Sequence, residues 1–263
     1  MVIFMSSLFC KRFLAGIKRR MLPRTLTVIL SIVYFNIAIA EEILIAVASN
    51  FARPAQEIVD EFEMQTGHEV RIVLGSSGRI FAQISNGAPF HIFMSADASK
   101  PAALINAGLA SGKSRFTYAT GALVLWSNLP DLIVDGPGVL ESQRLNSLAL
   151  ANPRVAPYGQ AAVEVLENLG LRDKTESKWV QGENIAQTFQ FVESGNAELG
   201  FVALAQVADG RGWQVPPQLH QPIQQDVVLL NSAAESITSR EFMEYLRSSA
   251  VREIIRSYGY GVE

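Results

Sequence analysis

Cysteine and histidine are scarce in this sequence. The one cysteine, Cys10, lies within the first forty residues, and the three histidines, His68, His91 and His220, are far apart. A chain without paired cysteines has no disulfide framework and no thiolate metal site. Histidines at such separations do not have the spacing of a metal-binding cluster. The sequence therefore gives no support to a resident metal centre.

Phosphate-binding and catalytic motifs are also missing. The sequence contains neither a G-x-x-x-x-G-K-[ST] loop nor a G-x-G-x-x-G fingerprint. The turn Gly75-Ser76-Ser77-Gly78 is one residue shorter than a G-x-S-x-G nucleophile elbow, and no histidine lies in a recognisable partner context. Asp97 follows an apolar strand, where an aspartate commonly caps a helix. We therefore expect no catalytic residue, and an exported hydrolase remains the weaker alternative.

Positive charge is concentrated at the amino terminus. Six of the 22 basic residues and none of the 25 acidic residues lie in the first forty positions, so residues 41–263 carry 16 basic and 25 acidic residues, a formal net charge of −9. Proteins hold nucleic acid by neutralising its phosphates with basic side chains. We therefore expect no nucleic-acid partner, and any anion must be bound without net positive charge.

The first forty residues have the pattern of an export signal. A basic segment is followed by the largely apolar run Leu26–Ala38 and by the small-residue ending Ala38-Ile39-Ala40. This pattern predicts a signal peptide over residues 1–40, cleaved after Ala40, with Met21 as an alternative start. A membrane anchor is the weaker alternative because the apolar run is short for a bilayer span. Cys10 precedes the run, so it does not occupy the acylation position of a lipoprotein, and we expect a periplasmic protein.

The remaining sequence alternates short apolar strands with amphipathic helices. Strands are expected at 43–47, 70–74, 92–94, 121–126, 148–150, 199–202 and 227–230. Helices are expected from Pro54 to Gly67, around 80–84, at 161–169, at 185–192 and over the tail 241–258. This alternation predicts an α/β fold with mainly parallel sheets flanked by helices and with ligands at the carboxyl ends of strands.

Small or neutral polar residues follow the strands where helices begin. Ser49-Asn50 follows the first strand, Ser76-Ser77 follows the second, and Pro157-Tyr158-Gly159 precedes the helix at 161. The free N–H groups and positive dipole of a helix start suit an anion. Such donors favour an anion that has no proton of its own, because that proton would find no acceptor. The alternative is that these residues are ordinary helix caps.

Several segments, in order and spacing, resemble the periplasmic molybdate-binding proteins of ABC transporters. They are Ala48-Ser49-Asn50-Phe51, Gly75-Ser76-Ser77-Gly78, Gly87-Ala88-Pro89, Phe93-Met94-Ser95-Ala96-Asp97, Asn152-Pro153, Pro157-Tyr158-Gly159 and Gly200-Phe201-Val202. The resemblance spans residues 43–258. It implies a type II periplasmic-binding fold, with lobe 1 formed by 41–122 plus 227–263, lobe 2 by 123–226, and the ligand between them.

The resemblance also implies the residues that hold the ligand. They are Ser49, Asn50, Ser77, Tyr158 and the backbone of Ile185. Many members carry a tyrosine at the position of Ala203, and we expect the Tyr158 hydroxyl to replace it as a donor. The alternative is that the Tyr158 backbone N–H donates to the anion while the ring covers the cleft. The sequence also departs from the family's common pattern at Phe90-His91, with no evident consequence.

The function that follows from this resemblance is capture of molybdate for an ABC importer. The expected partners are the molybdate oxyanion, with tungstate also accepted, and a membrane permease. We expect no cofactor, no directly coordinated metal, and a monomer. A binding protein for sulfate, thiosulfate or an organic anion is the alternative within the same fold.

Overall fold

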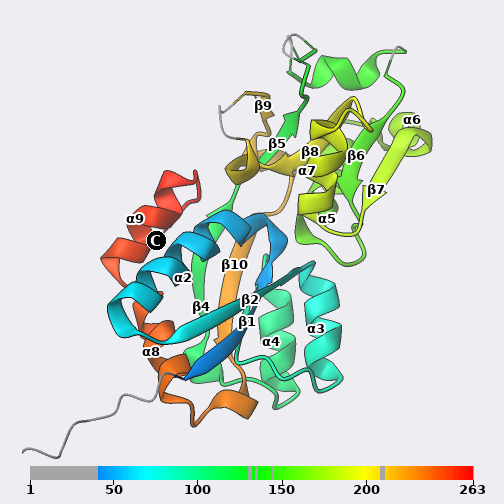
Figure 1. Ribbon diagram of the computed structural model, residues 1–263. Coiled ribbons are helices and arrows are strands. Elements are labelled where there is room, and N and C mark those ends of the chain that lie inside the picture. Colours follow the sequence, from blue (N-terminus) through cyan, green and yellow to red (C-terminus); the bar gives the residue numbers. More distant parts are fainter. Residues whose placement is uncertain (1–40, 130–131, 134–135, 144, 208–210, 263) are drawn as a thin grey trace, which may run out of the picture. The chain divides into compact units, whose positions relative to one another are not determined.

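The structure of the protein is a computed structural model. It describes residues 41–129, 132–133, 136–143, 145–207 and 211–262. The expected signal peptide, with Cys10, lies outside the described residues. The described part contains two five-stranded sheets flanked by helices (Figure 1). This confirms the expected α/β fold.

The first sheet has the strand order β2-β1-β3-β10-β4. Its strands are β1 (Glu42–Ala48), β2 (Glu69–Gly75), β3 (Ile92–Met94), β4 (Phe116–Gly121) and β10 (Ile223–Leu229). Strand β1 is parallel to β2 and β3, whereas β10 is antiparallel to β3 and β4. Four of the five strands therefore run in one direction, with β10 opposing them.

The second sheet repeats this arrangement with the order β7-β6-β8-β5-β9. Its strands are β5 (Leu123–Trp126), β6 (Leu148–Ala151), β7 (Trp179–Gly182), β8 (Leu199–Ala203) and β9 (Trp213–Gln214). Strand β6 is parallel to β7 and β8, and β5 is antiparallel to β8 and β9. Here β5 is the opposing strand, so both sheets are mainly parallel, as expected.

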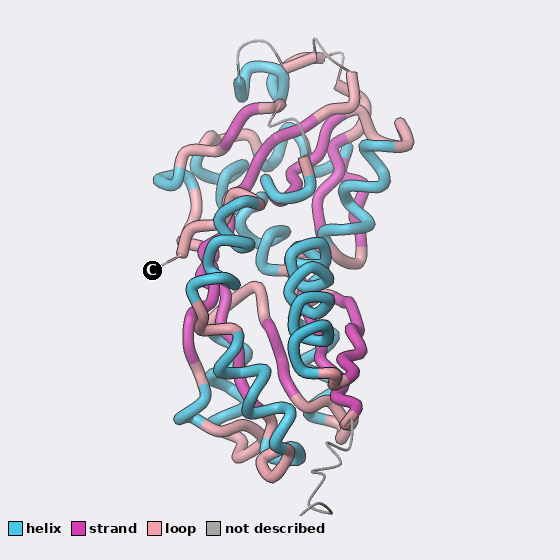
Figure 2. The backbone as a smooth tube through the Cα atoms, turned by 60° about the vertical axis from the view of Figure 1, so that its left-hand side comes forward, coloured by secondary structure: helices cyan, strands magenta, loops and turns pink. Residues whose placement is uncertain are grey.

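Helices cover both sheets (Figures 1 and 2). Those that follow or precede strands of the first sheet are α2 (Ala52–Thr66), α3 (Ser77–Ser85), α4 (Ser99–Asn106), α8 (Ile237–Tyr245) and α9 (Ser249–Ser257). Those connecting strands of the second sheet are α5 (Pro157–Asn168), α6 (Arg172–Thr175) and α7 (Ile185–Glu193). Short 3-10 turns occur at η1 (Ser49–Phe51), η2 (Gly112–Ser114), η3 (Gly136–Glu141), η4 (Glu176–Lys178), η5 (Leu204–Gln206), η6 (Pro217–Leu219) and η7 (Asn231–Ala233).

Strand β1 shows why the first sheet is buried on both faces. Ile43, Ile45 and Val47 belong to one apolar cluster with helices α2, α8 and α9, whereas Ala46 belongs to another with α3 and α4. Alternate residues of a strand point to opposite faces, so each face has its own helical cover. This is why the strand is a nearly continuous apolar run.

The expected single strand at 121–126 was wrong. Phe116–Gly121 belongs to the first sheet and Leu123–Trp126 to the second, with only Ala122 between them. The chain thus changes sheet inside one apolar run. It returns after β9, and the expected lobe boundary between 226 and 227 falls inside β10.

The expected single helix at 241–258 is also two helices, α8 and α9. Ser248 separates them, because its side chain accepts a hydrogen bond from the Val251 N–H and so caps α9. A serine at this position favours a helix start over helix continuation.

Candidate functional site

Ends of strands and starts of helices surround one small cavity. Strand β1 ends at Ala48 and β2 ends at Gly75, and these two residues are paired in the sheet, so the strand ends lie side by side. Helices α5 and α7 begin at the same cavity. Its volume is about 10 Å³, which is room for about one water molecule. It is lined by Ala48, Ser49, Asn50, Gly75, Ser76, Ser77, Ala96, Ala156, Pro157, Tyr158 and Ile185.

All five residues expected to bind the ligand line this cavity. They are Ser49, Asn50, Ser77, Tyr158 and Ile185. None is more than 5% exposed. The structure therefore brings together residues that are up to 136 positions apart in the sequence, the separation of Ser49 and Ile185. The lining also includes Ser76, which the sequence placed among the polar residues at helix starts but not among the five expected ligand residues.

The cavity has no charged side chain among the described residues that line it. Helices α3, α5 and α7 all begin there, at Ser77, Pro157 and Ile185. Each helix start carries free N–H groups and a partial positive charge. The cavity is therefore built to offer hydrogen-bond donors to an anion without a lysine or an arginine.

The hydroxyl of Ser77 is oriented by the backbone. Its Oγ accepts a hydrogen bond of 2.9 Å from the Ala96 N–H. A hydroxyl whose lone pair is used in this way still has its own hydrogen to donate. Ser77 is fully buried, so that hydrogen can reach only another buried group.

The side-chain amide of Asn50 donates its hydrogen bonds within the protein and not to the cavity. Its Nδ2 donates to Gln225 Oε1 at 2.8 Å and to the Tyr260 hydroxyl at 3.1 Å. The Tyr260 hydroxyl in turn donates to the Asn50 carbonyl at 2.8 Å. Both amide hydrogens of the Asn50 side chain therefore have partners, and the side chain holds the turn after β1 in place.

The Tyr158 hydroxyl also has protein partners. It accepts a 3.3 Å hydrogen bond from Gln225 Nε2 and is hydrogen-bonded to Tyr260. A Cβ added at Gly121 would lie 2.1 Å from this hydroxyl oxygen, so the phenol reaches the point where the chain leaves β4. Burial raises the pKa of Tyr158 well above its ordinary value, which keeps the phenol neutral. This geometry gives no support to the expected donation from the phenol to an anion.

Sequence reasoning missed the residues that form this network behind the cavity. Gln225 lies in β10 and is fully buried, and its Oε1 also accepts from the Tyr118 hydroxyl at 3.1 Å. Tyr260 follows α9 at the end of the chain. The signal that could have indicated Gln225 is the polar run Gln224-Gln225-Asp226, which continues directly into the apolar residues of β10. Gln225 and Asp226 are buried although Gln224 is exposed, and buried polar side chains require partners.

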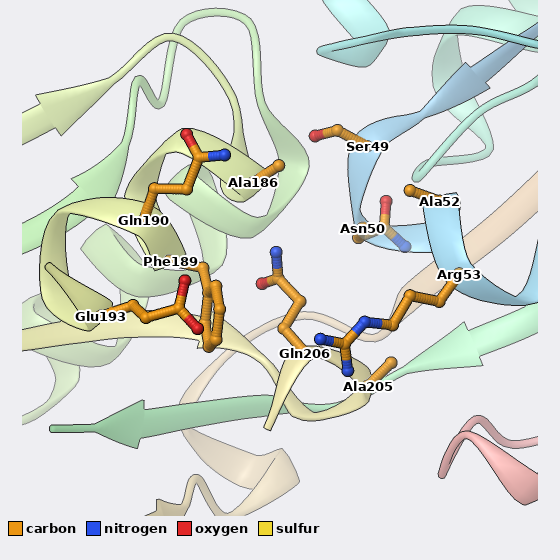
Figure 3. A pocket seen from close by; sticks show the side chains of 10 residues that line it. All are labelled: Ser49, Asn50, Ala52, Arg53, Ala186, Phe189, Gln190, Glu193, Ala205 and Gln206. Atoms are coloured by element: carbon orange, nitrogen blue, oxygen red, sulfur yellow. The ribbon is translucent and has the colours of Figure 1, made fainter. Parts of the chain in front are cut away.

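A larger pocket of about 250 Å³ adjoins the cavity (Figure 3). The two share Ser49 and Asn50, and the pocket is also lined by Ala52, Arg53, Ala186, Phe189, Gln190, Glu193, Ala205 and Gln206. Arg53 from α2 and Glu193 from α7 are its charged residues, and they approach it from different walls. Gln206 Nε2 donates to the Ile185 carbonyl at 3.2 Å, which ties η5 to the start of α7.

Two contacts join the start of α3 to segments of the second sheet. The Gly78 N–H donates to the Val155 carbonyl at 2.8 Å. Arg79 binds Glu183 through two hydrogen bonds of 2.5 and 3.1 Å, and both side chains are 57% exposed. These contacts lie next in sequence to Ser77 and two residues before Ile185, so they flank the cavity.

The histidines are separate from the cavity. His91 Nδ1 accepts from the Leu44 N–H at 3.0 Å, and His68 Nε2 lies 3.4 Å from a Glu241 carboxylate oxygen. Within the part of the chain that the structure describes, no group of three histidine, cysteine, aspartate or glutamate residues is placed to hold a metal ion.

Comparison with known proteins identifies related chains. Residues 43–261 match the family model described as bacterial extracellular solute-binding protein. The molybdate-binding protein ModA of Azotobacter vinelandii is 46% identical over 230 residues, covering 85% of this chain and 91% of that protein. The ModA protein of Rhodobacter capsulatus is 45% identical over 229 residues, covering 86% of this chain and 90% of that protein.

A solved structure agrees with these sequence matches. The periplasmic molybdate-binding protein of Azotobacter vinelandii superposes with a TM-score of 0.80 at 40% identity, covering 84% of this chain and 99% of that chain. These relatives are solute-binding proteins, not enzymes. The chain therefore belongs to the family of bacterial extracellular solute-binding proteins that includes these molybdate-binding proteins.

Proposed function

We propose that this chain binds molybdate, and tungstate as well, as the substrate-binding component of an ABC importer. The observation that carries the proposal is the buried, uncharged cavity where three helices begin beside the Ser77 hydroxyl. A dianion without protons can accept hydrogen bonds from every such donor. Two relatives at 45–46% identity are named molybdate-binding proteins, which supports molybdate as the ligand.

In the ligand set that we propose, some residues bind the ion through side chains and others through backbone N–H groups. Ser49 and Ser77 offer hydroxyl groups, and Asn50, Tyr158 and Ile185 offer backbone N–H groups at the starts of η1, α5 and α7. The Asn50 and Tyr158 side chains are assigned to the network with Gln225, because their polar atoms already have partners there. The tyrosine missing at Ala203 is then not replaced by another phenol.

We also propose that the two sheets are the cores of two lobes and that molybdate closes them on each other. One lobe comprises 41–122 and the end of the chain, and the other begins at 123, as the sequence suggested. We place the second boundary ahead of Ile223 and not at 226/227, so that all of β10 stays with its sheet. Ser49, Asn50 and Ser77 then belong to one lobe, and Tyr158 and Ile185 to the other.

The proposed setting is the periplasm. Export rests on the signal pattern over 1–40, and a solved relative is described as periplasmic. In the described residues no helix has the length and apolar character needed to cross a bilayer. The partner in transport is a membrane permease, and the protein delivers its ligand as a monomer.

Calorimetry with a panel of oxyanions tests this proposal. The protein purified from the periplasmic fraction should bind molybdate and tungstate with similar affinity and should bind sulfate much more weakly, because a rigid donor cage set for a longer metal–oxygen bond leaves the smaller sulfate under-coordinated. Phosphate should bind poorly because its proton finds no acceptor. Equal affinity for sulfate and molybdate would contradict the proposal and favour a sulfate-type cargo.

A further inference from the structure

Ser76 is a buried polar residue whose hydroxyl has no hydrogen-bond partner among the described residues. It is 4% exposed and lines the small cavity. Ser76 occupies the N-cap position of α3 with an extended backbone (φ −76°, ψ 147°), yet its side chain makes no capping hydrogen bond. The usual structural explanation for a serine at a helix start therefore does not apply here.

A buried hydroxyl without a partner lowers the stability of the folded protein. Among the described residues, buried side-chain polar atoms have hydrogen-bond partners with three exceptions, and Ser76 Oγ is one of the three. The other two, Trp126 Nε1 and Ser239 Oγ, belong to residues outside the lining of both cavities. Ser76 differs from them because it lines a cavity.

We propose that Ser76 is a further ligand-binding residue, whose hydroxyl donates a hydrogen bond to the tetrahedral dianion beside the hydroxyl of Ser77. The inference rests on the proposed function of the cavity. The Ser77 hydroxyl accepts a hydrogen bond from the Ala96 N–H and can donate its own hydrogen to the ion. The Ser76 hydroxyl neither accepts nor donates a hydrogen bond within the described protein. Two consecutive residues at one helix start thus offer hydroxyl hydrogens to different oxygens of one ion.

The chemistry of the cavity selects this kind of ligand. An apolar molecule would leave the Ser76 hydroxyl unpaired, and a cation would be repelled by the positive ends of α3, α5 and α7. A fully deprotonated oxyanion accepts from the hydroxyl and from the helix starts together. Ser76 therefore strengthens binding of the ion and is satisfied by it.

Calorimetry on Ser76→Ala tests the proposal, with molybdate as the probe. Loss of one hydrogen bond to a charged group should weaken binding roughly ten- to hundredfold. The matched control is Ser239→Ala, which removes the other unpaired serine hydroxyl, buried in α8. It should leave molybdate affinity unchanged.

Thermal unfolding without ligand gives a second readout. Neither Ser76→Ala nor Ser239→Ala should lower the melting temperature, because neither hydroxyl has a partner in the protein. With added molybdate, the temperature shift should be smaller for Ser76→Ala than for the parent and Ser239→Ala.

Three results would overturn the inference. One is unchanged molybdate affinity in Ser76→Ala while Ser77→Ala binds more weakly, which leaves the proposed function intact. Another is a lower melting temperature of ligand-free Ser76→Ala with the affinity preserved, which indicates a structural role. If the parent itself does not bind molybdate, the proposed function fails together with this inference.

Discussion

Ser77 divides the hydrogen-bonding capacity of its hydroxyl between the protein and the cavity. The Ala96 N–H fixes the oxygen, so the hydrogen is directed without a conformational search. Preorganisation of this kind reduces the entropy lost on binding. The residue is therefore suited to hold a small ion whose affinity depends on a few well-placed donors.

Substitution of Ser77 should weaken molybdate binding through the lost donor. Ser77→Ala removes a hydrogen bond to a charged ligand worth ~1.5–3 kcal/mol, and Ser77→Asp should abolish measurable binding because it places a carboxylate against a dianion. Ser77→Ala also leaves the Ala96 N–H without its partner, which should cost about 1–3 kcal/mol of stability. Calorimetry and urea unfolding measure the two effects. A Ser77→Asp protein that still binds molybdate would place the site elsewhere.

Tyr158→Phe should leave molybdate affinity nearly unchanged. The substitution keeps the ring and the backbone N–H at the start of α5, and the deleted hydroxyl interacts with Gln225 and Tyr260. The variant should instead lose stability, by about 1 kcal/mol for one hydrogen bond. Calorimetry and thermal unfolding should show this separation. A tenfold or greater loss of molybdate affinity at unchanged stability would show that the Tyr158 phenol binds the ion.

Adding Ala203→Tyr to the Tyr158→Phe variant gives a second test of whether the Tyr158 phenol binds the ligand. If the Tyr158 phenol were a ligand donor, a tyrosine at position 203 would restore part of the affinity lost in Tyr158→Phe. Ala203 is fully buried in β8 and does not line the cavity, so we expect no gain from the second substitution.

At the scale of elements, the start of α3 contacts Val155, which lies between β6 and α5. A Cβ on Gly78 would lie 2.9 Å from both the Cα and the carbonyl oxygen of Val155, closer than real side chains approach. Gly78 is therefore needed for the hydrogen bond between its N–H and Val155. Its backbone follows Ser77 directly, so displacement here moves a proposed ligand residue.

Gly78→Ala should reduce molybdate affinity by separating α3 from the segment before α5. The ligand-free stability should change little, because the contact joins two sheets that each have their own core. Gly112→Ala is the matched control, since a Cβ there meets only the Ile105 side chain at 3.4 Å. Calorimetry on both variants checks the expectation. Equal loss in the two would show that the Gly78 contact has no special part in binding.

Elements with a clear apolar period could be predicted from the sequence, and the site could be predicted as a set of helix starts. The change of sheet at Ala122 could not be predicted, because residues 121–126 have the pattern of one apolar strand. The composition of a strand does not show which neighbouring strands it pairs with. The hydrogen-bond partners of the Tyr158 hydroxyl could not be predicted from the sequence either. Gln225 is 67 residues away from Tyr158, and no local pattern connects them.

At the scale of the molecule, the five expected ligand residues come from segments attached to both sheets. If they bind one ion together, the ion favours the conformation in which the two sheets are close. Small-angle scattering should then show a smaller radius of gyration with saturating molybdate than without it. The same radius in both states, with binding verified by calorimetry, would indicate that closure does not depend on the ligand.

The described residues that line the small cavity carry no charged side chain, and this neutrality affects the rate at which an ion can bind. Residues 41–263 carry a formal net charge of −9, so the net charge of the protein repels an approaching dianion while the residues that line the final site are neutral. Dissolved salt screens this repulsion over a Debye length of about 10 Å at 0.1 M ionic strength. The association rate measured by stopped-flow fluorescence should therefore rise as sodium chloride is added, whereas a cation-lined site would show a fall. A rate that falls with salt would mean that Arg53, at the rim of the larger pocket, dominates the approach of the ion.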